Sequence, residues 1–286
     1  MKPSLGERVF SVFNSILLTL IGLSTLLPFI HVVAKSFSSD VYVISGQVGI
    51  WPLGFNIEAY KFAFKNTPIL IAFKNTAFVT FVGTCLALII SSAAAYSLSL
   101  PNLYGRKLLM YFFVFTMFFN GGLIPSFLLM RSLGLMNNLW SLILPHLLVV
   151  YNMILIKNYF EGLPDSIRES AMIDGASNIT IYSRIIMPMS KPILATIAVF
   201  SAVGFWNSYF NAMLYLSDPK KITLQLFLVN LVRQADLMDS INSEIIVPPD
   251  TVRAVSVVIG TVPILLVYPL MQEHFVKGIT MGSVKG

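Results

Sequence analysis

Residues 73–98 read FKNTAFVTFVGTCLALIISSAAAYSL, and this stretch decides the fold class. From Thr76 onward it contains no charged residue, and Pro101 follows its end. A helix needs about 20 apolar residues to cross the hydrocarbon core of a bilayer. Lipid offers no hydrogen-bonding partner to an open backbone, so the spanning segments of such a chain are helices. We therefore expect a membrane-spanning helix here.

Further apolar runs of similar length lie on both sides of this stretch. The chain has 286 residues, of which 56% are hydrophobic and 11% are charged, whereas a soluble domain carries about 25% charged residues. The mean hydropathy of +0.79 agrees. We predict an all-α polytopic membrane protein, with residues 1–286 forming one transmembrane domain and six spans at about 9–33, 73–98, 108–130, 139–156, 193–215 and 252–271.

The charges in the short connections predict the topology. Arg106 and Lys107 lie between the second and third spans, and Lys2 and Arg8 precede the first. Lys and Arg accumulate on cytoplasmic loops, so both termini are expected in the cytoplasm. The first apolar run is longer than the 7–15 residues or so of a signal peptide core, so we interpret it as an uncleaved span.

Several function classes are disfavoured by what the chain contains. The net charge is +6, but the basic residues are scattered and form no stripe typical of nucleic-acid binding. The sequence has no G-x-x-x-x-G-K-[ST], H-E-x-x-H or G-x-S-x-G pattern. We therefore expect no catalytic residue, no metal site and no cofactor bound by this chain.

The connection between the fourth and fifth spans is the most informative segment. Residues 163–192 read LPDSIRESAMIDGASNITIYSRIIMPMSKP. Ser166 and Glu169 have the spacing of a capping box, and Gly175 suits the residue just past a helix end. We predict a short helix over about 166–174, a sharp turn at Gly175, and a second helical stretch over about 177–187. Such a helix either lies on lipid headgroups or docks into a partner protein.

The segment from Glu169 to Ala176, followed by Pro188 and Pro192, resembles the EAA loop of the permease subunits of type I ATP-binding-cassette (ABC) importers. That pattern reads E-A-A-x-x-D-G-A, then I-x-x-P, and Ser170 is the departure in its core. The resemblance implies a cytoplasmic coupling loop over 161–191, whose helix fits a groove on a separate ATPase. The coupling residues it implies are Glu169, Ala171, Met172, Asp174, Gly175 and Pro188.

The resemblance extends over most of the chain. The stretches LGLMNNLW at 133–140 and WNSYF at 206–210 are similar to family patterns, and residues 268–286 resemble the tail of a maltose-transporter-like subunit. That tail reaches the ATPases, which implies contacts through Gly278, Gly282 and Lys285. The outer insertion at 216–251 resembles a subgroup that takes up oligosaccharides cut from polysaccharides.

Together these similarities imply a permease subunit of an oligosaccharide importer in the bacterial cytoplasmic membrane. The implied partners are a second homologous permease subunit, which makes a heterodimer, two ABC ATPases that bind ATP and Mg²⁺, and an extracytoplasmic binding protein that delivers the sugar. The permease itself is not an enzyme.

Polar residues inside apolar spans are costly, so they are candidates for the transport path. Amides and aromatic rings suit sugar hydroxyls. Each Asn taken alone is explained equally well by hydrogen bonding between helices. His146, which follows Pro145, is interpreted as a packed residue. The candidate path residues are Asn120, Asn152, Trp206, Asn207, Tyr209 and Asn211.

Two other classes of membrane protein fit these features less well. An ion-coupled secondary transporter normally places a carboxylate or a basic group in mid-membrane, and none of the expected spans has an Asp, Glu, Lys or Arg near its centre. A membrane scaffold would not need the short helix with its Asp-Gly turn. An ABC permease for a solute other than a sugar stays open.

Overall fold

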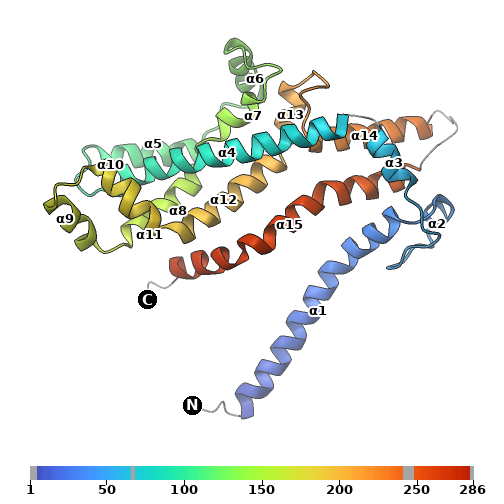
Figure 1. The fold of residues 1–286 in the computed structure, drawn as a ribbon, viewed down its shortest axis with the longest axis horizontal. Helices are drawn as coiled ribbons and strands as arrows, with labels where there is room; N and C mark the ends of the chain where they lie inside the picture. The colour runs from blue at the N-terminus through green and yellow to red at the C-terminus, as the bar shows by residue number, and fades with distance from the viewer. Residues whose placement is uncertain (1–4, 66–67, 241–247, 284–286) are drawn as a thin grey trace. The chain divides into compact units, whose positions relative to one another are not determined.

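The computed structural model describes residues 5–65, 68–240 and 248–283, and every regular element in those ranges is a helix (Figure 1). The chain divides into two compact units. The first comprises Met1–Thr67 and Leu228–Val262, and the second comprises Pro68–Phe227 and Pro263–Gly286.

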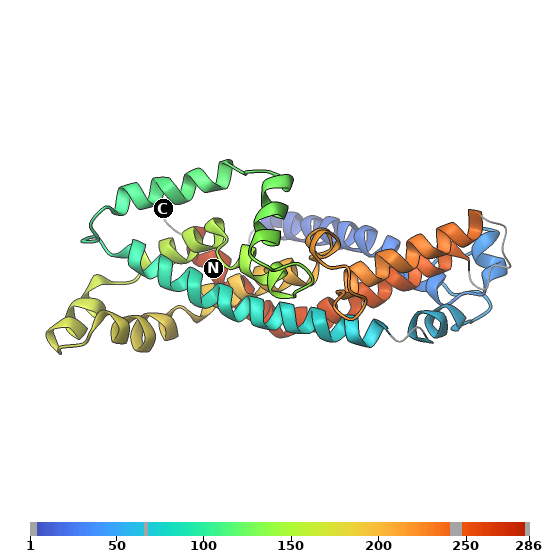
Figure 2. The ribbon, with the colours of Figure 1, turned by 90° about the horizontal axis from the view of Figure 1, so that it is seen from above.

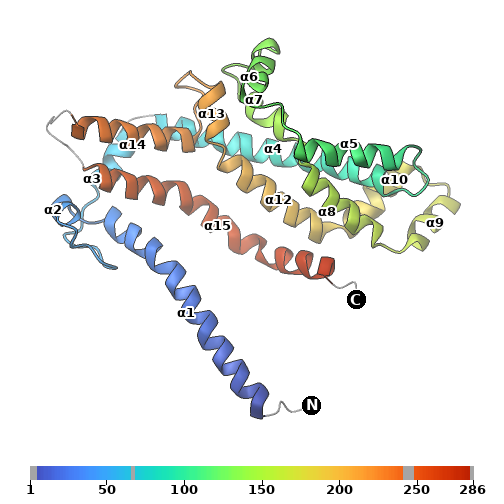
Figure 3. The same ribbon diagram turned by 180° about the vertical axis from the view of Figure 1, so that it is seen from behind.

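The second unit is built around one long helix, α4 (Pro68–Ser99), which packs along α8 (Val150–Glu161) and α12 (Lys191–Trp206). These three helices lie side by side in both views of the ribbon (Figures 1 and 3). The remaining elements of this unit are α5 (Arg106–Phe118), α6 (Leu123–Ser132), α7 (Trp140–Ile143), η1 (Leu144–His146), α9 (Asp165–Ile173), α10 (Asn178–Ile181), η2 (Tyr182–Ile186), α11 (Met187–Met189) and α13 (Phe210–Tyr215).

Among the described residues, three helices are long and apolar enough to cross a membrane without interruption: Val9–Ser36, Ile69–Ser99 and Pro249–Leu266. Three pairs of helices pass the same test only when each bent pair is taken together, which raises the number of candidate spans to as many as six. Their bends are 111° between α5 and α6, 47° between η1 and α8, and 82° between α11 and α12.

The breaks fall where the sequence lacks helix formers. Gly122 precedes α6 with a φ of +91°, a conformation that glycine adopts without the steric cost of a Cβ. The expected span 108–130 is therefore two helices that meet at a sharp bend (Figure 2). Pro145 lies in η1, just ahead of the bend into α8, and Asn207 ends α12, so the expected span 193–215 is also divided.

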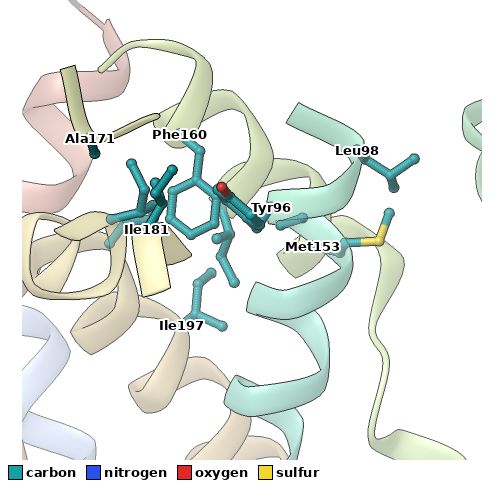
Figure 4. Packing of buried hydrophobic residues seen from close by; sticks show 11 residues of the cluster. Tyr96, Leu98, Met153, Phe160, Ala171, Ile181 and Ile197 are labelled. Carbon is teal, nitrogen blue, oxygen red and sulfur yellow. The ribbon is translucent and has the colours of Figure 1, made fainter. Parts of the chain in front are cut away.

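A buried cluster joins α4, α8 and α12 near the 161–191 loop. Ile156 and Ile197 are fully or almost fully buried, and Tyr96 from α4 lies against Phe160 from α8 (Figure 4). Toward the other end of α4, Gly83 faces the Phe205 ring, since a Cβ built at Gly83 would lie 2.7 Å from it. A small residue at this position lets α4 and α12 approach closely, as is common between helices in membranes.

The first unit contains α1 (Leu5–Ser36), α2 (Asp40–Ile44), α3 (Glu58–Lys65), most of α14 (Leu224–Ser240) and the first part of α15 (Pro249–Ser283). Ion pairs join these elements: Lys35 of α1 lies 2.8 Å from Asp250 of α15, and Arg253 lies 2.7 Å from Asp236 of α14. Gly278 and Gly282 lie within α15, whereas Lys285 lies outside the described residues.

Candidate functional site

The short helix α9 begins one residue earlier than expected. It covers Asp165–Ile173, and its N-cap is Pro164, which makes no side-chain capping bond. The capping box expected between Ser166 and Glu169 is therefore wrong, because Ser166 already lies inside the first turn. Pro164 is extended, with φ −61° and ψ 125°, and Asp165 places a negative charge at the positive end of the helix dipole.

The end of α9 is a Schellman motif. The Ala176 N–H donates to the Ala171 carbonyl at 2.9 Å, and the Gly175 N–H donates to the Met172 carbonyl at 3.0 Å. Gly175 has a φ of +78°, and nothing lies within 4 Å of the position a Cβ would take. The sharp turn expected at Gly175 is present, and glycine is needed there for its backbone conformation alone.

The two faces of α9 differ in burial. Ala171 is 7% exposed and belongs to the buried cluster with Ile181 (Figure 4). On the outside, Ile173 is 86% exposed and Ile179 of α10 is 78% exposed. Glu169, Met172 and Asp174 are also exposed. Ala171 therefore holds α9 on its own bundle, while the residues around Ile173 leave an apolar surface edged by carboxylates.

The second half of the loop connects α9 to α12. The Ser177 side chain caps α10 by accepting from the Thr180 N–H at 3.3 Å. In η2 the Met187 N–H donates to the Tyr182 carbonyl, five residues earlier, which is a π-helical turn. The Tyr182 hydroxyl lies 2.7 Å from the Ser92 hydroxyl of α4. Pro188 lies in α11, and the chain then bends into α12.

A cluster of charges lies where α8 leads into this loop. Glu161, the last residue of α8, pairs with Lys157 one turn earlier and with Arg106 at the start of α5. The Arg106 Nε also donates to the Leu98 carbonyl of α4 at 2.7 Å. The end of α8 is therefore tied to the connection between α4 and α5, four residues before α9 begins.

Two cavities lie where the broken helices meet. The first has a volume of about 520 Å³, and its polar lining residues include Asn152 of α8 and Asn207, Tyr209 and Asn211 at the break between α12 and α13. The second has a volume of about 560 Å³ and is lined by Asn120, Ser126 and again Asn211. The cavities also share His146 and Phe210.

Most of the candidate path residues are thus brought together, with one exception. Trp206 lines neither cavity, because its ring is buried and meets the Phe73 ring edge-on at 5.8 Å. His146, which sequence reasoning assigned to packing, borders both cavities, and its Nε2 lies 3.3 Å from the Asn211 amide nitrogen. Its position after Pro145, inside an apolar run, is the signal that marks it.

A second polar junction joins the 133–139 connection to the 216–223 connection. Asn137 has a φ of +55°, and its side-chain oxygen accepts from the Ser217 N–H at 2.6 Å and from the Asp218 N–H at 3.1 Å. The Lys221 ammonium donates to the Asn137 carbonyl at 2.7 Å. Asn137, the first residue of the Asn-Asn pair within the stretch 133–140, therefore links the two connections.

The second unit has helices of membrane length that are broken around polar cavities, and a short two-faced helix, α9, lies between two of them. These features are typical of a membrane transport subunit. Residues 83–281 match the family described as the inner membrane component of binding-protein-dependent transport systems, and the chain belongs to this family. It is a permease component of an ABC transporter in the cell membrane; the family is not enzymatic, and the ATPase is a separate subunit. Membership also implies a solute-binding protein as a partner.

Full-length relatives support this assignment. The chain is 41% identical over 285 residues to the polygalacturonan/rhamnogalacturonan transport system permease protein YtcP of Bacillus subtilis (strain 168), covering 98% of this chain and 99% of that protein. It is 41% identical to protein LplC of the same organism, with coverage of 100% and 98%. A solved bacterial ABC transporter that imports the acidic polysaccharide alginate contains a chain that is 33% identical, with a TM-score of 0.84 and coverage of 96% and 99%.

Proposed function

We propose that this chain forms half of the transmembrane channel of an importer for oligosaccharides released from polysaccharides. In this proposal it spans the membrane six times, with both termini and the 161–191 loop in the cytoplasm. Its partners are a second homologous permease subunit, two ABC ATPases that carry ATP and Mg²⁺, and an extracytoplasmic protein that delivers the sugar. Residues 1–286 act as one transmembrane domain.

The observation that carries the proposal is the two-faced α9. Its inner face is packed through Ala171, so the apolar outer surface at Ile173 and Ile179 has no use within the described part of the chain. Exposed apolar patches edged by polar groups mark protein or membrane interaction sites, and the similarity of residues 169–176 to the EAA loop favours a protein partner. We assign this surface, with Glu169, Met172 and Asp174 beside it, to the ATPase. Gly175 and Pro188 shape the loop, and Gly278, Gly282 and Lys285 are assigned to a tail contact with the ATPases.

The path from α9 to the cavities is continuous along the chain. The 161–191 loop leads into α12, and α12 ends at Asn207, which lines the first cavity. Movement of α9 with the ATPases would therefore reach the cavity wall through the rest of the loop and α12. This is the route by which ATP binding would open the path for the sugar.

The sugar assignment is supported by the lining of the cavities. Asn120, Asn152, Asn207 and Asn211 supply amide donors and acceptors, and Tyr209 supplies a ring with a hydroxyl. Such groups suit the hydroxyls and the apolar faces of sugar rings. Permeases of galactooligosaccharide and trehalose/maltose systems are also among the relatives, at 28% identity each.

The proposal is tested with the importer purified together with its ATPases and reconstituted in vesicles. Ile173→Asp and Ile179→Asp should each reduce copurification of the ATPase, while the exposed Tyr104→Ser serves as the control. Labelled oligogalacturonides are added together with the binding protein on the opposite side of the membrane from the ATPases. Their uptake should require ATP on the side that carries the ATPases. Uptake that follows an ion gradient without ATP would overturn the proposal, and ATP-driven uptake of only a non-sugar solute would overturn its substrate class.

A further inference from the structure

We propose that His146 and Asn211 form a pair, where the linings of the two cavities overlap, that binds sugar hydroxyl groups as a saccharide passes this subunit. This inference rests on the proposed transport of oligosaccharides. It assigns a sugar-binding role to His146, which the sequence alone indicated as a packed residue. It also states which chemical groups of the sugar the pair binds.

The geometry places the pair where the linings of the two cavities overlap. His146 ends η1 just before the bend into α8, and Asn211 lies in the first turn of α13, just after the break that follows α12. Both side chains line both cavities, and their nitrogen atoms lie 3.3 Å apart. A ligand in either cavity is therefore within reach of this pair.

The chemistry of the pair suits a hydroxyl group. A neutral imidazole has one donor and one acceptor, and a carboxamide has two donors and an oxygen with two lone pairs. The mutual contact occupies one position on each side chain. The imidazole also makes a hydrogen bond with the Leu142 backbone, so both of its nitrogens are engaged. A sugar hydroxyl both donates and accepts, so it can bind to the remaining donor and acceptor of the Asn211 amide or insert between the two nitrogens. The Phe205 ring packs edge-on against the imidazole at 6.4 Å and restricts its orientation.

The surroundings define which face of the sugar is bound. Phe200, Phe205 and Phe210 line the first cavity beside the pair and offer apolar contact to the C–H face of a pyranose ring. Within the described residues, neither cavity is lined by Asp, Glu, Lys or Arg. We infer that this pair reads hydroxyl groups on the sugar and contributes no ion pair to a uronic acid carboxylate.

The test uses the complete reconstituted importer. His146→Leu and Asn211→Leu remove the hydrogen-bonding groups at similar side-chain volume, and the double variant tests their coupling. Asn158→Leu, an exposed position on α8 that lines neither cavity, is the matched control. Uptake is measured for neutral and carboxylated oligosaccharides of equal length, together with ATPase stimulation by the binding protein and retention of the second permease subunit.

Each single variant should reduce the specificity constant for uptake about tenfold, which is the size expected for one lost hydrogen bond. The loss should be the same for neutral and carboxylated sugars, and the double variant should lose less than the product of the singles because the two groups act on one ligand. Retention of the second permease subunit should match the control.

Three results would overturn the inference. Unchanged uptake in the double variant would place the pair outside the path. A loss confined to carboxylated sugars would show charge recognition instead. Loss of the second permease subunit would show that a partner helix fills the cavities. A wild-type importer that takes up no saccharide would instead contradict the proposed function, so the two failures are distinguishable.

Discussion

The Lys157 ammonium nitrogen lies 2.8 Å from the Glu161 carboxylate, and only 10% of the Lys157 side chain is exposed. Glu161 is the C-terminal residue of α8, where a carboxylate faces the negative end of the helix dipole. The unfavourable interaction with the helix dipole is offset by ion pairs with Lys157 and with Arg106, which approaches from α5. This charge cluster holds the start of the coupling loop against the bundle.

Glu161→Gln should therefore destabilise the protein. The change leaves the mostly buried Lys157 charge without its partner, and since Glu161 itself is 29% exposed, we expect a loss of roughly 1–3 kcal/mol, less than for a fully buried pair. The thermal unfolding midpoint in detergent measures it. Adding Lys157→Met to Glu161→Gln should recover stability. Asp165→Asn, which removes a 3.5 Å contact with Arg168 from a carboxylate side chain that is 79% exposed, is the control and should cost less than about 1 kcal/mol.

Gly175→Ala should strain the turn after α9 without any clash. A Cβ at Gly175 meets no atom within 4 Å, so the cost is the left-handed backbone alone, about 1–2 kcal/mol. We expect weaker stimulation of ATPase activity by the binding protein and slower uptake. Gly175→Asn should behave closer to wild type, because Asn tolerates this conformation better. Equal activity of Gly175→Ala and wild type would show that the turn is not needed for coupling.

Ala171→Leu should act on the bundle and not directly on the ATPase surface. Ala171 is packed in the cluster with Ile181, and overpacking such a site costs about 1–3 kcal/mol. The unfolding midpoint should fall, whereas Ile173→Ser, on the exposed face, should leave it within about 0.5 kcal/mol of wild type in stability. If Ala171→Leu is as stable as wild type but loses the ATPase, Ala171 faces the partner and the assignment of faces is reversed.

Asn137→Ala should loosen the connection between α13 and α14. The substitution removes the acceptor used by the Ser217 and Asp218 N–H groups and leaves a residue that disfavours a φ of +55°. Trypsin cleavage after Lys220 or Lys221 should become several times faster in the variant. Asn137→Asp keeps the acceptor oxygen and is the control. Equal cleavage rates in Asn137→Ala and wild type would show that the junction does not restrain this connection.

Much of the helical architecture follows from local sequence. Residues 76–98 carry no charge, and α4 covers the whole stretch 73–98 as one helix. The turn at Gly175 follows from a short-range backbone requirement, which is why an Asp-Gly pair after an amphipathic segment predicts it. The EAA-like pattern around it led to the same family that the comparison over residues 83–281 shows.

Tertiary structure decided the features that depend on contacts between distant residues. Local spacing suggested a capping box at Ser166, but the chain enters α9 through Pro164, so the helix starts one residue earlier. The resemblance implied a coupling role for both Ala171 and Met172, yet packing against Ile181 buries Ala171 while Met172 is exposed.

The cavities were the least accessible to sequence reasoning. An Asn in an apolar run indicates either the transport path or a hydrogen bond between helices. The sequence does not separate the two, because in both cases an amide is placed inside the membrane at a cost that a polar partner offsets. Only the breaks at η1 and after α12 bring His146 and Asn211 together, while Trp206 turns into the packed interior against Phe73. The sequence by itself thus determined the helices, the turn and the family, since these depend on composition and near neighbours. The three-dimensional arrangement decided which polar side chains share a cavity, because that depends on where broken helices redirect the chain.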